Sequence, residues 1–510
     1  MPVSLSNFKT WLKSPQHIRR ILVEVDNVTN LTGGSATSYY FANGAYTSTS
    51  ADSPSNQIYL PYIAGGVSFS ENFSITGELS ISYGDISLLN ADGNIDSYLT
   101  KIWVRKPLRI YLGDPSWPKS DFKLIFKGLV ADCISSGRDS VNLVILDQLT
   151  GLNTAISEAT FTTAQTTIAN TGNTPQLIPL AFGECFNVTP VLVDKALLEY
   201  QVHVGRINDI IEVRDNGLPV EFTKYLTTGK FRLNQAPYGQ ITCSVQGDAP
   251  NGSYTNKVGG IIANIVTNYG INKANFSSAD MSNLASFDVA NPNRPVGIYI
   301  SDKQTIIDVC NQLAASVSAK LTTTIGPLTS DSDVGKLKLS KLKYNSLATY
   351  TSPILASDIE ENSISISEKI PVKAATRLAY CKNWTVQESG LAYGLPPEHV
   401  DFFAKEYLFS TDNTDSTIKA NYQLSSEITE DQTLLITKVG ADLEANERKS
   451  LWVGQRYVYT MTCYAYFFDV QLGDAVSITN RRFNLNGTVG TVMSISRDWL
   501  SGRIQLGVIV

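Results

Sequence analysis

Several patterns that would assign a chemistry are missing from this chain of 510 residues. It has no run of Lys or Arg, and its formal net charge is -6, so we predict no sequence-specific binding of nucleic acid. Residues 1–9 lack the basic and then apolar pattern of a signal peptide. No apolar run approaches the roughly 18 residues that span a membrane, so we expect synthesis in a cytosol and no membrane segment.

Catalytic signatures are also missing. Neither H-E-x-x-H nor G-x-S-x-G occurs, and the three histidines, His17, His203 and His399, lie far apart in the sequence. The cysteines form no C-x-x-C pair, and most have apolar or small neighbours, which favours reduced, buried, structural thiols. They are Cys133, Cys185, Cys243, Cys310, Cys381 and Cys463. We therefore predict no enzyme activity, no catalytic, cofactor-binding or metal-ligating residues, and no cofactor.

Two acidic stretches suggest a site but have the wrong spacing or surroundings. Asn90 to Asp96 lacks an acidic or amide residue two positions before Asn90 and the later bidentate Glu that a calcium loop needs, so we expect a plain turn. Asp358, Glu360 and Glu361 suggest the paired carboxylates of a glycosidase. They lie between turn-rich segments, and no aromatic groove with a second acid can be placed beside them, so a solvated loop is favoured.

The chain does contain two similar β-rich stretches near its ends. In the first, Leu112-Gly113-Asp114 is followed by alternating strands over 124–134 and 141–146, with a turn between them. In the second, Leu472-Gly473-Asp474 is followed by alternating residues over 488–495, a turn, and a strand over 504–510.

The spacing of these features indicates an internal duplication. Gly113 to Gly128 is 15 residues and Gly473 to Gly490 is 17. Gly128 to Leu143 is 15 and Gly490 to Leu506 is 16. The shared Leu-Gly-Asp alone is weak, because Gly-Asp is common turn chemistry, and two unrelated hairpins with similar turns are the alternative. If the duplication holds, two similar β-barrels bracket the chain.

Composition and periodicity divide the chain into five parts. Asp215-Asn216-Gly217 predicts a hairpin turn within a β-rich stretch, and apolar residues from Val258 to Val266 predict a helix. We expect Ser301 or Asp302 to cap a second helix. The predicted parts are 1–150, first β-barrel; 151–175, linker; 176–248, small all-β module; 249–352, α/β domain; and 353–510, second β-barrel with an amphipathic helix at about 434–449. The fold class is mainly β with a smaller α/β part, multidomain, with two barrels bracketing the other modules.

The order of these motifs resembles the tail hub proteins of tailed bacteriophages and related prophages, which form the baseplate hub or tail tip. The resemblance covers most of the chain, and none of its motifs is chemically unique. Besides the two Leu-Gly-Asp barrels, it rests on Phe182-Gly183-Glu184 to Val193, Val213-Arg214-Asp215-Asn216-Gly217, Pro237 to Gly247, and Tyr380-Cys381-Lys382-Asn383-Trp384-Thr385-Val386-Gln387.

The resemblance implies a structural virion protein made in the bacterial host cytoplasm. Tail tubes are rings of six similar barrels, whereas tip spikes and fibres are commonly threefold. A homotrimer with two tail-tube-like barrels per chain would match both symmetries. The implied neighbours are a tail tube or distal tail protein on one side and a tip spike or fibre protein on the other, around a DNA channel whose acidic wall would not hold phosphates.

The composition fits this reading without deciding it. Only 17% of residues are charged, and there are 24 Tyr, 19 Phe and 6 Trp, which suits buried interface cores and equally the cores of β-rich domains. Two other functions are compatible with the sequence. One is a receptor- or carbohydrate-binding tail protein, with the sugar bound by the 176–248 module, and the other is a hydrolase.

Overall fold

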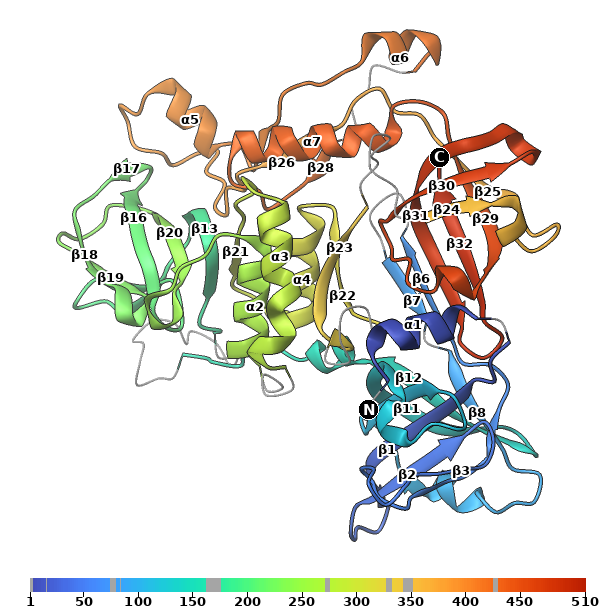
Figure 1. Ribbon diagram of the computed structural model, residues 1–510. Helices are drawn as coiled ribbons and strands as arrows, with labels where there is room; N and C mark the ends of the chain where they lie inside the picture. Colours follow the sequence, from blue (N-terminus) through green and yellow to red (C-terminus); the bar gives the residue numbers. More distant parts are fainter. Residues whose placement is uncertain are drawn as a thin grey trace. The chain divides into compact units, whose positions relative to one another are not determined.

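The computed structural model describes residues 3–14, 16–73, 79–82, 84–161, 176–270, 276–326, 333–342, 352–424 and 430–510. The protein is multidomain and mainly β, as predicted. It forms two compact units (Figure 1). Unit 1 comprises residues 1–150, 322–371 and 455–510, and unit 2 comprises 151–321 and 372–454. Each unit is assembled from more than one stretch of chain. The division into five linear parts stays a prediction.

The first sheet of unit 1 is a nearly closed β-barrel. Its strands lie in the order β2-β1-β10-β11-β12-β8-β5, and β9 also pairs with β1. Leu60 narrows the gap between the edge strands, since its N–H donates to the Tyr40 carbonyl and its own carbonyl accepts from Ala42. The strands are β1 (Arg20–Asn30), β2 (Thr37–Ala42), β5 (Ile63–Ala64), β8 (Asp85–Leu89), β9 (Lys101–Ile102), β10 (Pro107–Gly113), β11 (Lys123–Gly137) and β12 (Ser140–Asp147).

The second sheet of unit 1 is built mainly from the end of the chain. Its order is β24-β30-β31-β32-β29-β25, and the hairpin β6–β7 from the N-terminal part adds to β31 through β6. The strands are β6 (Ser68–Phe73), β7 (Leu79–Ser82), β24 (Ser352–Leu355), β25 (Ser365–Ile370), β29 (Arg456–Tyr464), β30 (Ala475–Asn480), β31 (Leu485–Asp498) and β32 (Arg503–Ile509).

Six strands follow the same route in both sheets. Numbered along the chain, they lie side by side in the order first, fourth, fifth, sixth, third, second: β1-β10-β11-β12-β8-β5 and β24-β30-β31-β32-β29-β25. The pairs agree in direction except the first, which is antiparallel for β1 and β10 but parallel for β24 and β30. In both sheets the third strand lies beside the sixth, a Greek-key return.

The two sheets also match residue by residue where β11 meets β12 and β31 meets β32. A β-carbon on Gly128 would lie 2.4 Å from the Leu146 carbonyl oxygen, and one on Gly490 would lie 2.6 Å from that of Ile509. A register shift follows each glycine at the same offset, between Val130 and Asp132 in β11 and between Val492 and Ser494 in β31. Such a shift marks a β-bulge, which bends a strand locally. Strand order, glycine position and bulge position thus recur in both sheets, as a duplication would require, and the duplication itself stays a prediction.

A continuous apolar core joins the two sheets of unit 1. In β12 the side chains of Val141, Leu143 and Ile145 are buried and alternate with less buried ones, which is the period-two pattern expected for a strand with one buried face. The short pair β3 (Tyr46–Thr47) and β4 (Ile58–Tyr59) contributes Tyr46 and Tyr59 to a second apolar cluster on the other side of β1.

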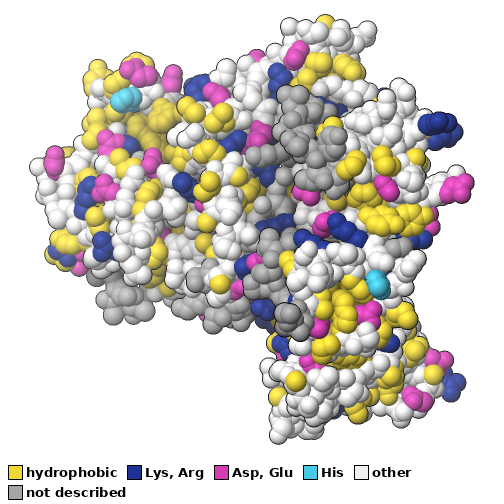
Figure 2. All heavy atoms as spheres, in the orientation of Figure 1, with side chains coloured by type: hydrophobic (Ala, Val, Ile, Leu, Met, Phe, Trp, Pro, Cys, Tyr) yellow, Lys and Arg dark blue, Asp and Glu magenta, His cyan; other side chains and the backbone are white. Residues whose placement is uncertain are grey.

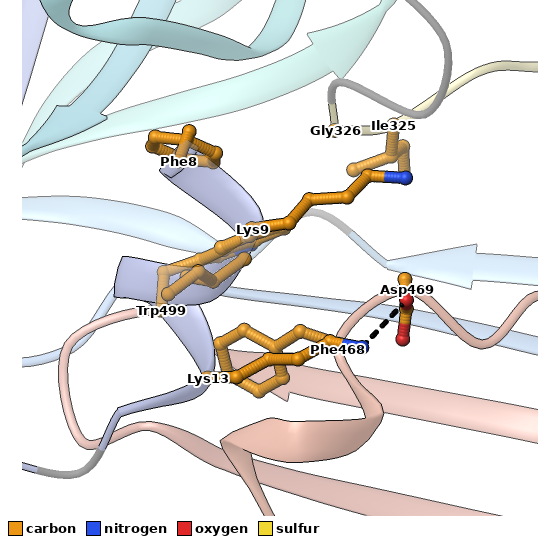
Figure 3. Close-up of a pocket in the computed structure, with 9 residues that line it drawn as sticks. Phe8, Lys9, Lys13, Ile325, Gly326, Phe468, Asp469 and Trp499 are labelled. Atoms are coloured by element: carbon orange, nitrogen blue, oxygen red, sulfur yellow. Dashed lines mark hydrogen bonds and ion pairs between the residues drawn. The ribbon is translucent and has the colours of Figure 1, made fainter. Parts of the chain in front are cut away.

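The N-terminal helix α1 (Leu5–Lys13) packs against the end of the chain (Figure 3). Ser4 caps it by accepting from the Asn7 N–H. Phe8 lines a small cavity of about 20 Å³ together with Phe468 and Trp499, and Lys13 pairs with Asp469 at 2.8 Å.

Unit 2 contains the small β-rich stretch predicted from the sequence. Its two sheets have the orders β17-β16-β20-β13-β21 and β14-β15-β19-β18. Asn216 and Gly217 both have positive φ, 47° and 86°, which confirms the predicted turn between β16 and β17. The strands are β13 (Leu180–Val188), β14 (Val191–Asp194), β15 (Glu199–Gln201), β16 (Ile207–Asp215), β17 (Leu218–Pro219), β18 (Phe222–Tyr225), β19 (Lys230–Leu233), β20 (Ile241–Asp248) and β21 (Gly297–Ile300).

Helices follow this β-rich part, as predicted, and α2 packs on both α3 and α4 (Figure 1). The cap expected at Ser301 or Asp302 is wrong: α4 begins after Thr305, whose hydroxyl both accepts from the Asp308 N–H and donates to its carboxylate. This reciprocal pair fixes the start of the helix. The helices are α2 (Val258–Asn268), α3 (Ser282–Ala290), α4 (Ile306–Ala315), α5 (Pro397–Phe403), α6 (Ser416–Asn421) and α7 (Lys438–Trp452).

The remaining strands include a three-stranded sheet of order β27-β26-β28 in unit 2. Helix α7, expected over 434–449, packs on β26 and belongs to unit 2. Its Glu444 is fully buried and pairs with Arg294 at 2.9 Å and with Arg448, one turn later, at 3.4 Å. The strands are β22 (Ala319–Thr323), β23 (Leu337–Lys341), β26 (Arg377–Tyr380), β27 (Leu408–Phe409) and β28 (Glu430–Gln432).

Candidate assembly surfaces and a polar groove

The cysteines are free thiols, and all but Cys381 are buried. Burial raises the pKa of Cys381 to about 11 and those of Cys133 and Cys463 to about 12. Because the thiolate is the reactive form, these thiols are poor nucleophiles and poor metal ligands near neutral pH. Among the residues that the structure describes, no three or more His, Cys, Asp or Glu side chains gather as a metal site would require.

His203 has a buried hydrogen-bond network that the sequence analysis missed. Its Nδ1 accepts from the Ala181 N–H at 3.1 Å, so Nε2 carries the proton and faces Asp248 at 3.3 Å. The Tyr269 hydroxyl lies 3.2 Å from the same nitrogen. The imidazole is fully buried, so the network connects β13 with the end of α2 and is closed to a substrate. These residues are far apart in the sequence, and no spacing rule could have grouped them.

The two acidic stretches are used locally. Asn90 accepts from the Ile95 N–H and donates to Asp96, which closes the expected turn with its own side chains. Asp358 accepts from the Leu355 N–H at 2.9 Å, and Glu360 lies 3.8 Å from Arg503. The side-chain oxygens of Asn90 and Asp358 therefore accept from the backbone, that of Asp96 accepts from Asn90, and Glu360 takes part in a surface ion pair.

Exposed apolar side chains mark one end of the first barrel. Leu31 follows β1 and is 69% exposed, and Val104 follows β9 and is 52% exposed. Ile102 of β9 is exposed as well, and it pairs with Thr29 of β1, so the three lie on neighbouring stretches of chain. Scattered apolar residues are normal on a surface, but a group at the end of a barrel is a candidate contact between copies or with another protein.

A second exposed apolar area lies over α5 and β17 in unit 2 (Figure 2). Leu218 on β17 and Val400 on α5 belong to it. Nearby loops display Tyr238 and Tyr393, both almost fully exposed. The Asp215 carboxylate accepts from the N–H groups of Tyr238 and Gly239, so the first of these loops is fixed to the turn that follows β16. Rigid, exposed tyrosines are typical of protein interfaces.

A polar groove of about 620 Å³ opens in unit 2. It lies between the ends of β21 and α4 on one side and the segments 382–386, 406–407 and 432–434 on the other. Trp384 and Tyr407 supply aromatic rings, and Asp302, Gln312, Glu406 and Gln432 supply planar polar groups. In the sequence Trp384 stands out only as part of the motif from Tyr380 to Gln387, which assigns it no role.

Similarity to known proteins is found among solved structures. No family model and no curated protein matches the chain. Three solved structures are similar over nearly its whole length. They are the tail protein from Neisseria meningitidis MC58 (10% identity, 96% of each chain covered, TM-score 0.38), the 43 kDa tail protein of prophage MuSo2 from Shewanella oneidensis (11% identity, 96% of this chain and 98% of that one, TM-score 0.40), and the prophage tail protein gp18 from Listeria monocytogenes EGD-e (8% identity, 96% and 94%, TM-score 0.32).

None of the described helices is both long and apolar enough to cross a membrane.

Proposed function

We propose that this chain is a structural virion protein that forms the hub at the tip of a bacteriophage tail or in its baseplate. The observation that carries the proposal is the repeated six-strand route within one chain, with the same glycine and the same bulge in both copies. The order of motifs along the sequence, which resembles tail hub proteins, agrees with it.

The repeated sheets suggest how such a hub would work. A tail tube presents sixfold symmetry to its neighbours, and a spike or fibre presents threefold symmetry. Three copies of a chain with two similar barrels supply six barrels in a ring, while every other part of the chain repeats three times. The proposed assembly is therefore a homotrimer that adapts one symmetry to the other.

The proposed partners are a tail tube or distal tail protein on one side and a spike or fibre protein on the other. The exposed apolar group at Leu31, Ile102 and Val104 is the candidate contact for the ring, and the area over α5 and β17 is the candidate for a neighbouring protein. Net acidity suits a channel through which DNA passes, since a basic wall would bind phosphates.

The protein is proposed to act without catalysis. The buried thiols have raised pKa values, and the buried imidazole of His203 is enclosed by its partners, so these groups offer no accessible nucleophile or base. Binding of a surface sugar is the second candidate function, and the polar groove of unit 2 is the observation that favours it.

Counting the copies in purified particles tests the hub. Quantitative mass spectrometry against the tube protein should give three copies of this chain per tail tip, and electron microscopy of the purified chain with tube protein should show rings. Six copies or one copy would rule out the adapter mechanism, and absence from the particles would rule out the virion role. Val104→Asp should reduce ring formation. The matched control is Val289→Asp, an exposed position in unit 2, which should not reduce it.

A further inference from the structure

The groove in unit 2 has the dimensions of a small-molecule site. It forms where two edge strands diverge, since β21 ends the five-stranded sheet and β28 ends the three-stranded one. Just before this point the chain segments are still joined, with the Gly297 N–H donating to the Leu434 carbonyl at 3.1 Å. The volume of the groove, about 620 Å³, lies inside the range of about 300–1,000 Å³ that ligand pockets occupy.

One wall of the groove is aromatic and held in place. The backbone N–H of Trp384 donates to the Phe186 carbonyl. The Trp384 ring meets the Tyr299 ring edge to face, with the ring centroids 6.2 Å apart. The Lys382 ammonium lies 4.6 Å from the Trp384 ring centre and 5.7 Å from that of Tyr407. Both of these lining rings remain partly exposed, so they offer apolar area to a ligand.

The floor beneath this wall is rigid. Asn383 is 3% exposed, and its amide oxygen accepts from Asn187 at 2.9 Å. Its amide nitrogen donates to the carbonyls of Phe403 and Lys405. A site whose backbone is fixed before binding loses less conformational entropy when the ligand enters.

The rim carries planar polar groups, one of which, Gln312, donates from its amide nitrogen to Gln304 at 3.0 Å. Asp302, Gln312 and Gln432 are exposed and line the groove. A carboxylate or amide presents two polar atoms side by side, which suits two neighbouring hydroxyl groups on one ligand. Glu406 adds a further carboxylate, and its separation of 3.8 Å from Lys382 leaves it open to another partner.

The charges of the groove exclude other classes of ligand. Among the described residues that line it, Asp302 and Glu406 face a single cation, Lys382, so the lining has a net negative charge and repels a phosphate or sulfate polymer. A wholly apolar ligand would strip water from the polar rim without replacing its hydrogen bonds, which costs free energy. A neutral molecule with apolar C–H faces and many hydroxyl groups suits both the aromatic wall and the polar rim.

We propose that this groove binds a neutral oligosaccharide, with a sugar ring against Trp384 and Tyr407 and its hydroxyl groups bound by Asp302, Glu406 and Gln432. The site lies wholly within unit 2 and is independent of the proposed hub. The sequence suggests a sugar site, if any, in the 176–248 module, whereas the residues that line the groove lie later in the chain, from Ile298 to Leu434.

Saturation-transfer NMR and calorimetry on the full chain test the site. The probes are chitotetraose, cellotetraose and maltotetraose, followed by an array of neutral bacterial surface glycans, with heparin tetrasaccharide as the anionic comparison. We expect a neutral glycan to bind. Trp384→Ala should weaken that binding by at least about tenfold, the loss expected when a partly buried aromatic contact is removed.

Two rim variants keep the test informative if Trp384→Ala disturbs the fold. Gln432→Ala and Asp302→Ala change exposed side chains and should each weaken binding by about threefold to tenfold, as loss of one or two hydrogen bonds does. Asp401→Ala, an exposed aspartate of α5 outside the groove, is the matched control and should bind as the unchanged chain does. Three results would overturn the proposal: no neutral glycan bound, binding insensitive to both rim variants, or stronger binding of heparin.

Discussion

The two six-stranded sheets of unit 1 share a backbone route but stabilise buried charge in different ways. On the first sheet, Glu24 is 2% exposed and accepts from Tyr59 at 2.7 Å, while Arg109 and Lys119 both approach it. All of these residues belong to the same repeat. On the second sheet, the buried Arg497 of β31 pairs with Glu71 of β6, which comes from the N-terminal part of the chain.

This comparison distinguishes the features that the fold requires in both sheets from the features that differ between them. The glycine and the bulge set how closely two strands approach and where they bend, so they recur in both sheets. The buried ions only need partners, and partners can come from any neighbouring segment. The β6–β7 hairpin thus connects one repeat to the other, and its charge pair is the sharpest point at which to separate them.

Glu71→Gln should have the largest effect. It leaves Arg497 buried with carbonyl partners at Phe468 and Val470 but without its carboxylate, and breaking a buried pair costs about 3–5 kcal/mol. Urea denaturation followed by tryptophan fluorescence measures the loss, since Trp11, Trp103, Trp117 and Trp499 all lie in unit 1.

The first sheet supplies the comparison for this variant. Glu24→Gln should cost only about 1–2 kcal/mol, because Arg109 is partly exposed and keeps Asp26 as a partner at 2.6 Å, and Lys119 still donates to the Ser53 carbonyl at 3.0 Å. The double variant Glu71→Gln/Arg497→Met should recover part of the stability. Equal losses from the two glutamate variants would show that the repeats do not differ in this respect.

Leu143→Ala and Leu506→Ala probe the shared core at matched positions. Leu143 pairs with Cys133 and Leu506 with Ile495, each five residues past its glycine, and both leucines are fully buried. Each substitution should cost about 2–5 kcal/mol through lost burial and the cavity left behind. The same denaturation experiment should give two losses within about 1 kcal/mol of each other, and a clear difference would weaken the equivalence of the sheets.

Gly128→Ala and Gly490→Ala probe the close strand contact. A β-carbon at either position would collide with a backbone carbonyl at 2.4 or 2.6 Å, so the strands must shift, at about 1–3 kcal/mol each. Gly205→Ala is the control, because a β-carbon on Gly205 would meet no atom within 4 Å. A neutral result at either glycine would mean that its recurrence has another cause.

Sequence patterns were sufficient for those features that local chemistry determines. Period-two alternation located β11, β12, β31 and β32, and the spacing of Gly128 and Gly490 related the two ends of the chain. The strand route itself could not be read, because a partner such as β6 for β31 depends on tertiary packing. The groove was also beyond reach, since Asp302, Trp384 and Gln432 meet only after the chain folds.

Acid should destabilise the segment of residues 43–62, because it protonates Asp52. Burial raises the pKa of this carboxyl, but hydrogen bonds from Thr49, Lys119 and Ser120 lower it more, to about 2. A depressed pKa adds stability that is present above the unfolded value of 3.8 and is lost as pH falls through about 2. Asp52→Asn should therefore cost about 1–2 kcal/mol at pH 6 and nothing below pH 2. Hydrogen exchange of residues 43–62 between pH 2 and 6 measures this, and a pH-independent difference would contradict the role of ionised Asp52.

Lys13→Ala should have the smallest effect. Lys13 and Asp469 connect α1 to the end of the chain at 2.8 Å (Figure 3), but both side chains are about one-third exposed, 37% and 33%. An ion pair this open to water contributes about 0.2–1 kcal/mol, and salt screens it. Within α1 the side chains of Phe8, Trp11 and Leu12 are buried, so apolar packing holds the helix in place. The difference between Lys13→Ala and the unchanged chain should therefore vanish in 1 M NaCl, where the Debye length is about 3 Å. A loss that exceeds about 1 kcal/mol and persists in salt would instead make this ion pair, and with it the contact between the two ends of the chain, a main support of unit 1.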